Sequence, residues 1–360
     1  MKLAIRVDTG THIGSGHLMR CFTLAKVCLK MNIDVVFISR QHPGHQLNLL
    51  PHDLPLLPLK ELPLSESSDG PLPHSHWLGC SELVDAEATI QALLQIDFIP
   101  DIFLVDHYAL SGEWESQVQD QFQCQIIAID GLLDRPHQCQ YLINPTLTKH
   151  DYVPGVKHLL EGPKYLPLRD EFRMKSSPKI RQSLNNYLIC FGGVDKDNWT
   201  LQTYLVLQKQ LKQAQNTQIN IVVGGGYLYL DSLKDHCSKH STTNLYIQTT
   251  EMASLMESAD IMIGAGGTIA WERCALGLPA ICWATADNQI VQNKRLEQEG
   301  AIVYLGESQD TLNKDLTITL DALTKDKSLI KKMSINSAKL MHNWPEQSLW
   351  LRDLKNRLSS

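Results

Sequence analysis

The sequence predicts an α/β protein made of two doubly wound domains, each with a parallel sheet covered by helices. Short apolar runs recur along the chain, and each is closed by small or polar residues and followed by a helix-like pattern, which is typical of this class. The pattern restarts after about residue 180. The chain of 360 residues is also longer than a domain with a single hydrophobic core usually is, and its 43% hydrophobic residues can fill two cores. We therefore expect two domains that face each other across a cleft.

The expected strands form two sets along the chain. The first set has four runs: KLAIRVD (2–8), DVVFIS (34–39), IFLVDHY (102–108) and IIAIDG (126–131). The second set has six: YLICFGG (187–193), INIVVGGG (219–226), NLYIQ (244–248), IMIGAGG (261–267), PAICWA (279–284) and AIVYLG (301–306). Between them, Ser176, Ser177 and Pro178 give the strongest linker signal. We therefore expect a first domain over 1–175, a second over 179–340, and a C-terminal helix over 341–360 that packs back on the first.

Charge and cysteine content limit the classes of partner. The chain has 33 basic against 39 acidic residues, a net charge of −6 and no dense basic block, so nothing indicates binding to nucleic acid or an anionic membrane. Nine scattered cysteines without paired metal-ligand spacing indicate buried thiols in a reducing cytoplasm. No segment approaches the roughly 20 apolar residues that span a bilayer. We expect a cytoplasmic protein with a small-molecule partner and no membrane insertion.

The loop after the first expected strand, in VDTGTHIGSGHLMRC, suggests a catalytic group. Gly10, Gly14 and Gly16 remove side chains where the backbone must bend or approach a ligand. His17 falls at the start of the next helix, whose partial positive charge disfavours the imidazolium and keeps the ring neutral, as a general base requires. A plain strand-to-helix turn explains this loop equally well, since its spacing is not the dinucleotide fingerprint.

A second glycine loop precedes a helix in IMIGAGGTIAWERCALGLPAI. Gly266 and Gly267 offer backbone amides suited to a diphosphate, and Thr268 stands at the expected helix cap. Glu272 lies one turn further on the same helix face, where its carboxylate can accept both hydrogen bonds of a ribose diol. The alternative is that Glu272 is a solvated helix residue.

Other polar groups follow the expected strands, where ligands of open α/β sheets bind. Gly193 in FGGVDKDN is expected to frame the same cleft, and the side-chain amides of Asn288 and Gln289 in ADNQ suit sugar hydroxyl or acetamido groups, although ordinary turn chemistry is a rival for each. The glycines of VVGGGY are interpreted as structural. Tyr108 can donate a hydrogen bond to substrate or water.

Two carboxylates in the first half leave two interpretations open. Asp106 in VDHY and Asp130 in AIDG stand directly after expected strands. They are polar groups at the strand ends, and capping of turns alone is the alternative for both.

The chain resembles a known family along most of its length. The resemblance is carried by RVDTGTHIGSGHLMRCFTLA, LVDHYAL, IDGLLDRPHQC, YLPLRDEF, ICFGGVD, MASLMESADIMIGAGGTIAWERCALGLPAI and ADNQ, in order from about residue 4 to residue 305. These segments are similar to the UDP-sugar hydrolases of the pseudaminic acid pathway, which act on UDP-2,4-diacetamido-2,4,6-trideoxy-β-L-altropyranose. That family is related to the MurG-type glycosyltransferases and implies the GT-B architecture, with two Rossmann-like domains and UDP held mainly by the second.

The resemblance implies a reaction and the residues that perform it. Hydrolysis at the anomeric carbon with inversion would release UDP and 2,4-diacetamido-2,4,6-trideoxy-L-altrose. His17 would activate the water, Tyr108 would lie beside it, and Asp8 could orient the imidazole. The substrate would contact Gly14, Gly16, Gly193, Gly266, Gly267, Thr268, Glu272, Asn288 and Gln289, with the diphosphate at Gly267 and Thr268 and the ribose at Glu272. No metal and no cofactor are implied.

Departures from the family and two rival functions remain open. An Asp130-Gly131 pair stands where the family often has two aspartates. The motif of an Asp-Gly pair and an arginine with which the family often closes beyond residue 305 is absent. A glycosyltransferase of the same fold is one rival, favoured by the Leu-rich segment 47–64. A non-catalytic UDP-sugar binding protein is the other. Hand-over of the product to the next enzyme of the pathway is a further open question.

Overall fold

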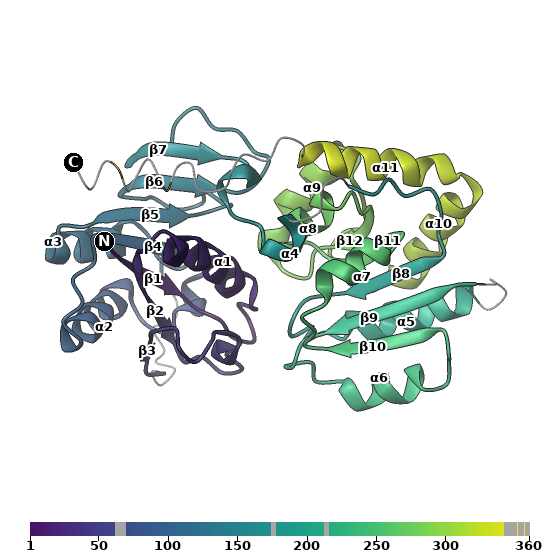
Figure 1. Ribbon diagram of the computed structural model, residues 1–360, viewed down its shortest axis with the longest axis horizontal. Coiled ribbons are helices and arrows are strands. Elements are labelled where there is room, and N and C mark those ends of the chain that lie inside the picture. Colours follow the sequence, from purple (N-terminus) through teal and green to yellow (C-terminus); the bar gives the residue numbers. More distant parts are fainter. Residues whose placement is uncertain (62–69, 174–177, 212–215, 342–350, 352–355, 357–360) are drawn as a thin grey trace. The chain divides into compact units, whose positions relative to one another are not determined.

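The computed structural model describes the chain except residues 62–69, 174–177, 212–215, 342–350, 352–355 and 357–360. It divides into two compact units, residues 1–167 with 345–360, and residues 168–344. Each unit contains one parallel sheet with helices packed against it (Figure 1). The predicted fold class is confirmed. Among the described residues, no helix has the length and apolar character that crossing a membrane requires.

The first unit is built on a seven-stranded sheet in the order β3-β2-β1-β4-β5-β6-β7, in which all strands are parallel. The strands are β1 (Lys2–Val7), β2 (Asp34–Arg40), β3 (Leu56–Leu59), β4 (Ile102–Asp106), β5 (Gln125–Ile129), β6 (Cys139–Asn144) and β7 (Val156–Glu161). The helices are α1 (Gly16–Lys30), α2 (Glu82–Gln95) and α3 (Gly112–Phe122), with short 3-10 turns η1 (Leu47–Leu49), η2 (Ser75–Trp77) and η3 (Pro163–Tyr165). The four predicted strands are present, and β6 and β7 were not predicted.

Alternation along β1 assigns the two faces of this sheet. Leu3, Ile5 and Val7 are buried in one cluster with residues of α1. Ala4, between them, is buried in another cluster with residues of α2 and α3. Successive strand residues point to opposite faces, so α1 covers one face and α2 and α3 cover the other.

The second unit has a six-stranded parallel sheet in the order β10-β9-β8-β11-β12-β13. Its strands are β8 (Asn186–Cys190), β9 (Gln218–Val223), β10 (Thr243–Ile247), β11 (Ile261–Ala265), β12 (Ala280–Trp283) and β13 (Ile302–Tyr304), and all six were predicted. Its helices are α4 (Asp170–Arg173), α5 (Trp199–Gln210), α6 (Leu230–Cys237), α7 (Met252–Ser258), α8 (Ile269–Ala275), α9 (Ile290–Gln298), α10 (Leu312–Lys325) and α11 (Lys327–Leu340), with the 3-10 turn η4 (Asp287–Gln289).

The unit boundary falls after Pro167, before the predicted linker, of which Ser176 and Ser177 lie outside the described residues. Most of the predicted C-terminal helix also lies outside them. Leu351 is described, is 4% exposed, and belongs to the core of the first unit on the α1 face of the sheet.

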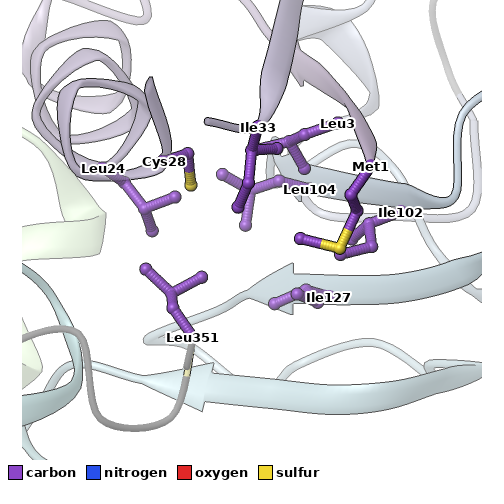
Figure 2. Close-up of a pocket in the computed structure, with 9 residues that line it drawn as sticks. All are labelled: Met1, Leu3, Leu24, Cys28, Ile33, Ile102, Leu104, Ile127 and Leu351. Carbon is purple, nitrogen blue, oxygen red and sulfur yellow. The ribbon is translucent and has the colours of Figure 1, made fainter. Parts of the chain in front are cut away.

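Leu351 closes a small apolar cavity in that core (Figure 2). The cavity has a volume of about 10 Å³ and is lined by Met1, Leu3, Leu24, Cys28, Ile33, Ile102, Leu104, Ile127 and Leu351. Leu3 and Ile102 stand at the amino ends of their strands, whereas ligands of open α/β sheets bind beyond the carboxyl ends. We therefore interpret the cavity as part of the core.

Candidate functional site

His17 lies at the second position of α1, as predicted, and contacts a carboxylate at the end of β4. Its Nδ1 is 2.7 Å from Oδ1 of Asp106, and the residue is only 6% exposed. A carboxylate can only accept, so Nδ1–H donates and Nε2 is left as the proton acceptor of the ring. This is the orientation that a general base needs.

The surroundings keep the His17 imidazole neutral. Burial lowers the pKa of His17, and Arg20 adds to this, while the Asp106 carboxylate opposes it. Burial would raise the pKa of Asp106, but the charges and hydrogen bonds of Arg20 and His17 together outweigh it and hold the pKa of Asp106 below its usual value. Arg20 donates from Nε and Nη2 to the two oxygens of Asp106. The result is a charged carboxylate beside a neutral base.

An aromatic cluster surrounds the His17 ring. The edge of the ring meets Tyr108 at 4.8 Å between centroids and Trp77 at 6.0 Å. His74 lies 4.8 Å from Trp77 and 5.6 Å from Tyr108. Burial raises the pKa of Tyr108, so its hydroxyl stays protonated and can donate. The predicted pair His17 and Tyr108 is brought together, whereas Trp77 and His74 were missed in a Pro- and Leu-rich segment without periodicity.

The predicted role of Asp8 in orienting His17 is wrong. Asp8 is fully buried and accepts from Arg6, from the backbone N–H of Arg40 at 2.7 Å and from Nε2 of His42 at 3.0 Å. His107 Nε2 lies 3.2 Å from Asp8. Strand alternation is the reason. Asp106 is the parallel partner of Val7 and faces α1 with it, so Asp8, the next residue, faces α2 and α3.

The glycine loop before α1 keeps an open backbone. Gly14 has a φ of +76° and no atom within 4 Å of the place where a Cβ would stand. Its N–H donates to the carbonyl of Gly10 at 2.8 Å, which closes the turn. Gly16 is the exposed first residue of α1. The predicted substrate contacts of Gly14 and Gly16 therefore stay predictions that the local geometry allows.

In the second unit, Gly266 and Gly267 lie between β11 and α8 and differ in their surroundings. A Cβ at Gly266 would collide with the buried side-chain amide of Asn293, so packing favours glycine there. Gly267 has a φ of +103° and open space at its Cβ position, and Nε2 of Gln292 donates to its carbonyl at 2.9 Å. Thr268 is the N-cap of α8, as predicted, but its side chain makes no capping hydrogen bond. Gly267 has open space beside it and the Thr268 side chain makes no capping bond, so their predicted diphosphate contacts stay predictions.

Glu272 is not a solvated helix residue. Its two carboxylate oxygens accept from Nε and Nη2 of Arg169 at 2.7 and 2.8 Å, and the residue is 8% exposed. Burial would lower the pKa of Arg169, but the hydrogen bonds and charge of Glu272 raise it above its ordinary value. Arg169 stands in the segment YLPLRDEF, and nothing in that segment indicates that it pairs with Glu272, 103 residues away.

The remaining predicted contacts lie in loops of the second unit. Gln289 is bonded within its own loop, where its Oε1 accepts from the N–H of Thr285 at 3.0 Å. Oδ1 of Asn288 is buried and has no hydrogen-bond partner among the described residues. The carbonyl of Gly193 occupies the space that a Cβ at Gly224 would need, which explains the first glycine of VVGGGY as structural. Asn288 therefore has free acceptor capacity, whereas Gln289 closes its loop.

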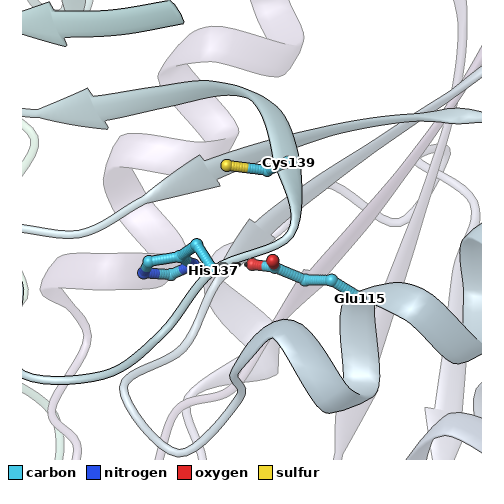
Figure 3. A group of neighbouring side chains, drawn as sticks. All are labelled: Glu115, His137 and Cys139. Atoms are coloured by element: carbon cyan, nitrogen blue, oxygen red, sulfur yellow. Dashed lines mark hydrogen bonds and ion pairs between the residues drawn. The ribbon is translucent and has the colours of Figure 1, made fainter. Parts of the chain in front are cut away.

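Glu115, His137 and Cys139 form a buried cluster in the first unit (Figure 3). Nδ1 of His137 is 2.7 Å from Glu115, and Nε2 is 3.1 Å from Asp130. Burial would lower the pKa of His137, but the two carboxylates raise it to about 9. Burial also raises the pKa of the Cys139 thiol. A charged imidazolium with both nitrogens bonded and a protonated thiol do not fit a metal ion, so we interpret the cluster as an ion-pair network.

The two units together define the GT-B fold. The structure is similar to MurG of Acinetobacter baumannii, with a TM-score of 0.64, 15% identity, and coverage of 99% of this chain and 100% of that one. It is also similar to a UDP-GlcNAc 2-epimerase from Neisseria meningitidis bound to UDP-GlcNAc, with a TM-score of 0.60, 13% identity, and full coverage of both chains. The glycosyltransferase family 28 C-terminal domain matches residues 191–344.

Relatives in sequence are more specific. The chain is 26% identical over 290 residues, 79% of its length and 92% of the relative, to the UDP-2,4-diacetamido-2,4,6-trideoxy-beta-L-altropyranose hydrolase of Campylobacter jejuni. It is 22% identical over 352 residues, 96% of its length and 90% of the relative, to the spore coat polysaccharide biosynthesis protein SpsG of Bacillus subtilis. It is 24% identical over 298 residues, 78% of its length, to the uncharacterized protein MJ1062 of Methanocaldococcus jannaschii and spans 55% of that protein. The resemblance drawn from the motifs is confirmed.

Proposed function

We propose that the protein hydrolyses UDP-2,4-diacetamido-2,4,6-trideoxy-β-L-altropyranose at the anomeric carbon with inversion. The observation that carries the proposal is the His17–Asp106 pair, in which a buried neutral imidazole is oriented by a carboxylate at the carboxyl end of β4. The similarity to the hydrolase of Campylobacter jejuni supports the choice of substrate.

The mechanism assigns water activation to the first unit. Water attacks the anomeric carbon while Nε2 of His17 takes one of its protons, and Asp106 stabilises the imidazolium that forms. The bond between the anomeric carbon and the phosphate oxygen breaks, and its electron pair leaves with UDP. The hydroxyl of Tyr108, protonated and beside His17, donates to the water or the sugar.

Nucleotide binding is assigned to the second unit. We assign the diphosphate to the amides of Gly267 and Thr268, where the local space is open, and the ribose hydroxyls to Glu272. The buried free acceptor of Asn288 receives an N–H or O–H of the sugar portion. Donors fixed before the reaction stabilise the charge that develops on UDP.

A glycosyltransferase is the second candidate, because residues 191–344 match a glycosyltransferase family. The difference between the two functions is the acceptor. An oriented base suits water and a sugar hydroxyl alike, so only the reaction products separate them. A non-catalytic binding protein is disfavoured, because it has no use for a buried histidine aligned by a carboxylate.

The test is an assay with the UDP-sugar and no acceptor in water enriched in ¹⁸O. We expect early samples to carry the label on the anomeric hydroxyl of the free sugar, with UDP unlabelled. His17→Gln should abolish turnover and keep UDP binding, whereas His12→Gln, an exposed histidine of the same loop, should behave like wild type. Label in a phosphate, or turnover only with an added sugar acceptor, would contradict the proposed hydrolysis.

A further inference from the structure

The carboxylate of Glu272 has acceptor capacity that the described residues leave unused. An ionised carboxylate has about four lone-pair positions, and Arg169 fills two of them, one on each oxygen. No other described residue donates a hydrogen bond to this side chain. A charged group that is 8% exposed is costly to leave half satisfied, so the two open positions indicate a ligand with two donors.

Arg169 is held rigidly while it makes this contact. Its guanidinium lies 4.8 Å from the ring of Phe172, and its Nη1 is 2.9 Å from Oε1 of Glu171. A guanidinium fixed on several sides keeps the carboxylate of Glu272 in one orientation. A ligand that binds there does not have to order the flexible glutamate side chain, which lowers the entropic cost of binding.

The contacts of Arg169 also argue against a direct role on phosphate. Its single positive charge faces two carboxylates, those of Glu171 and Glu272. Little net charge is left for a phosphate anion. The group that contacts the ligand is therefore the oriented carboxylate of Glu272 and not the guanidinium of Arg169.

We propose that Arg169 is a positioning residue for nucleotide selection: it orients Glu272 so that the two open acceptor positions receive the 2′- and 3′-hydroxyls of ribose. The inference rests on the proposed binding of UDP by the second unit. It adds selection of ribonucleoside over 2′-deoxyribonucleoside diphosphates, which requires both hydroxyls and a fixed carboxylate. The selectivity belongs to the Arg169–Glu272 pair and not to Glu272 alone.

The test compares UDP with 2′-deoxy-UDP by calorimetry. Wild type should bind UDP about tenfold more tightly, the order expected for one hydrogen bond to a charged group. Arg169→Lys keeps the charge but loses the side-on pair, so UDP affinity should fall about tenfold while 2′-deoxy-UDP, which keeps only the 3′-hydroxyl, loses less, and the preference for UDP shrinks. Glu272→Gln should also remove the preference. The matched control is Arg173→Lys on α4, an exposed arginine paired with Asp170 at 3.3 Å, which should keep it.

The outcomes separate this inference from the proposed reaction. Equal losses for both nucleotides in Arg169→Lys, or an unchanged preference, would overturn the positioning role. Arg169→Gln is measured in parallel, and circular dichroism confirms that each variant is folded. If the preference depends on Arg169 but no sugar is released, the inference stands and the hydrolase proposal fails. If wild type binds neither nucleotide, both fail.

Discussion

The charge on His137 should contribute a pH-dependent share of the stability of the first unit. The imidazolium donates to Glu115 at 2.7 Å and to Asp130 at 3.1 Å, and these carboxylates raise its pKa from 6.5 to about 9. A shift of this size corresponds to about 3 kcal/mol of folding free energy. The folded state holds the proton more tightly than the unfolded state, so the contribution is complete below pH 6.5 and is lost as the pH rises through 9.

Urea unfolding of wild type and His137→Gln at pH 6, 7.5 and 9.5 measures this contribution. The glutamine has no charge, so the difference in unfolding free energy between the two proteins should shrink by about 3 kcal/mol from the lowest to the highest pH. Comparing the two proteins at each pH cancels the titration of all other groups that the substitution leaves unchanged. His158→Gln, an exposed histidine of β7, is the control and should show no such trend.

A difference that stays constant from pH 6 to pH 9.5 would refute the charged state of His137. The same proteins also test the interpretation of the cluster as an ion-pair network. We expect zinc to leave the melting temperature of wild type unchanged. A zinc-dependent rise that His137→Gln abolishes would show instead that Glu115, His137 and Cys139 bind a metal ion.

Two further predictions concern catalysis and the core of the first unit. Asp106→Asn should lower kcat by about 10³- to 10⁴-fold with UDP affinity unchanged, because the imidazole loses its orienting carboxylate. The acid limb of kcat/KM lies below pH 6.5 in wild type, because the pKa of His17 is lowered, and it should move to still lower pH in the variant. An unmoved acid limb would show that Asp106 does not act on the catalytic base. Leu351→Ala should lower the unfolding free energy by about 2–5 kcal/mol, because it enlarges the apolar cavity. The control, Leu329→Ala on the exposed side of α11, should cost far less. Equal losses in urea unfolding would contradict the role of Leu351 in the core.

The predictability of the strands follows from their burial. All six strands of the second unit were predicted, because most are continuous apolar runs that end in glycine or alanine. The missed strands of the first unit, β6 and β7, lie together at one margin of its sheet. β7 is the edge strand, with an exposed lysine and histidine, and β6 beside it has two half-buried residues. Half-exposed edges carry a weak apolar pattern, so local sequence does not reveal them.

The site was predictable where function depends on local geometry. His17 follows a glycine loop at a helix start, and Gly267 and Thr268 stand in the same relation to α8, so short segments sufficed. Trp77 and Arg169 act through contacts 60 and 103 residues away in the chain, His17–Trp77 and Arg169–Glu272. Nothing in their own segments indicates those partners, since only the assembled fold brings them together.

The exchange of roles between Asp8 and Asp106 has a cause that the sequence already contains. Asp8 is nearer to His17 along the chain, and the resemblance suggested it as the orienting residue. Along a strand, however, side chains alternate between faces, and Asp8 continues the series of Ala4 and Arg6, which face α2 and α3. Asp106 continues the series of Ile102 and Leu104, which face α1. Because α1 covers one face of the sheet, a histidine of α1 can contact only a carboxylate whose position along its strand points it to that same face. Parity along the strand, rather than distance along the chain, therefore identifies Asp106 as the partner of His17.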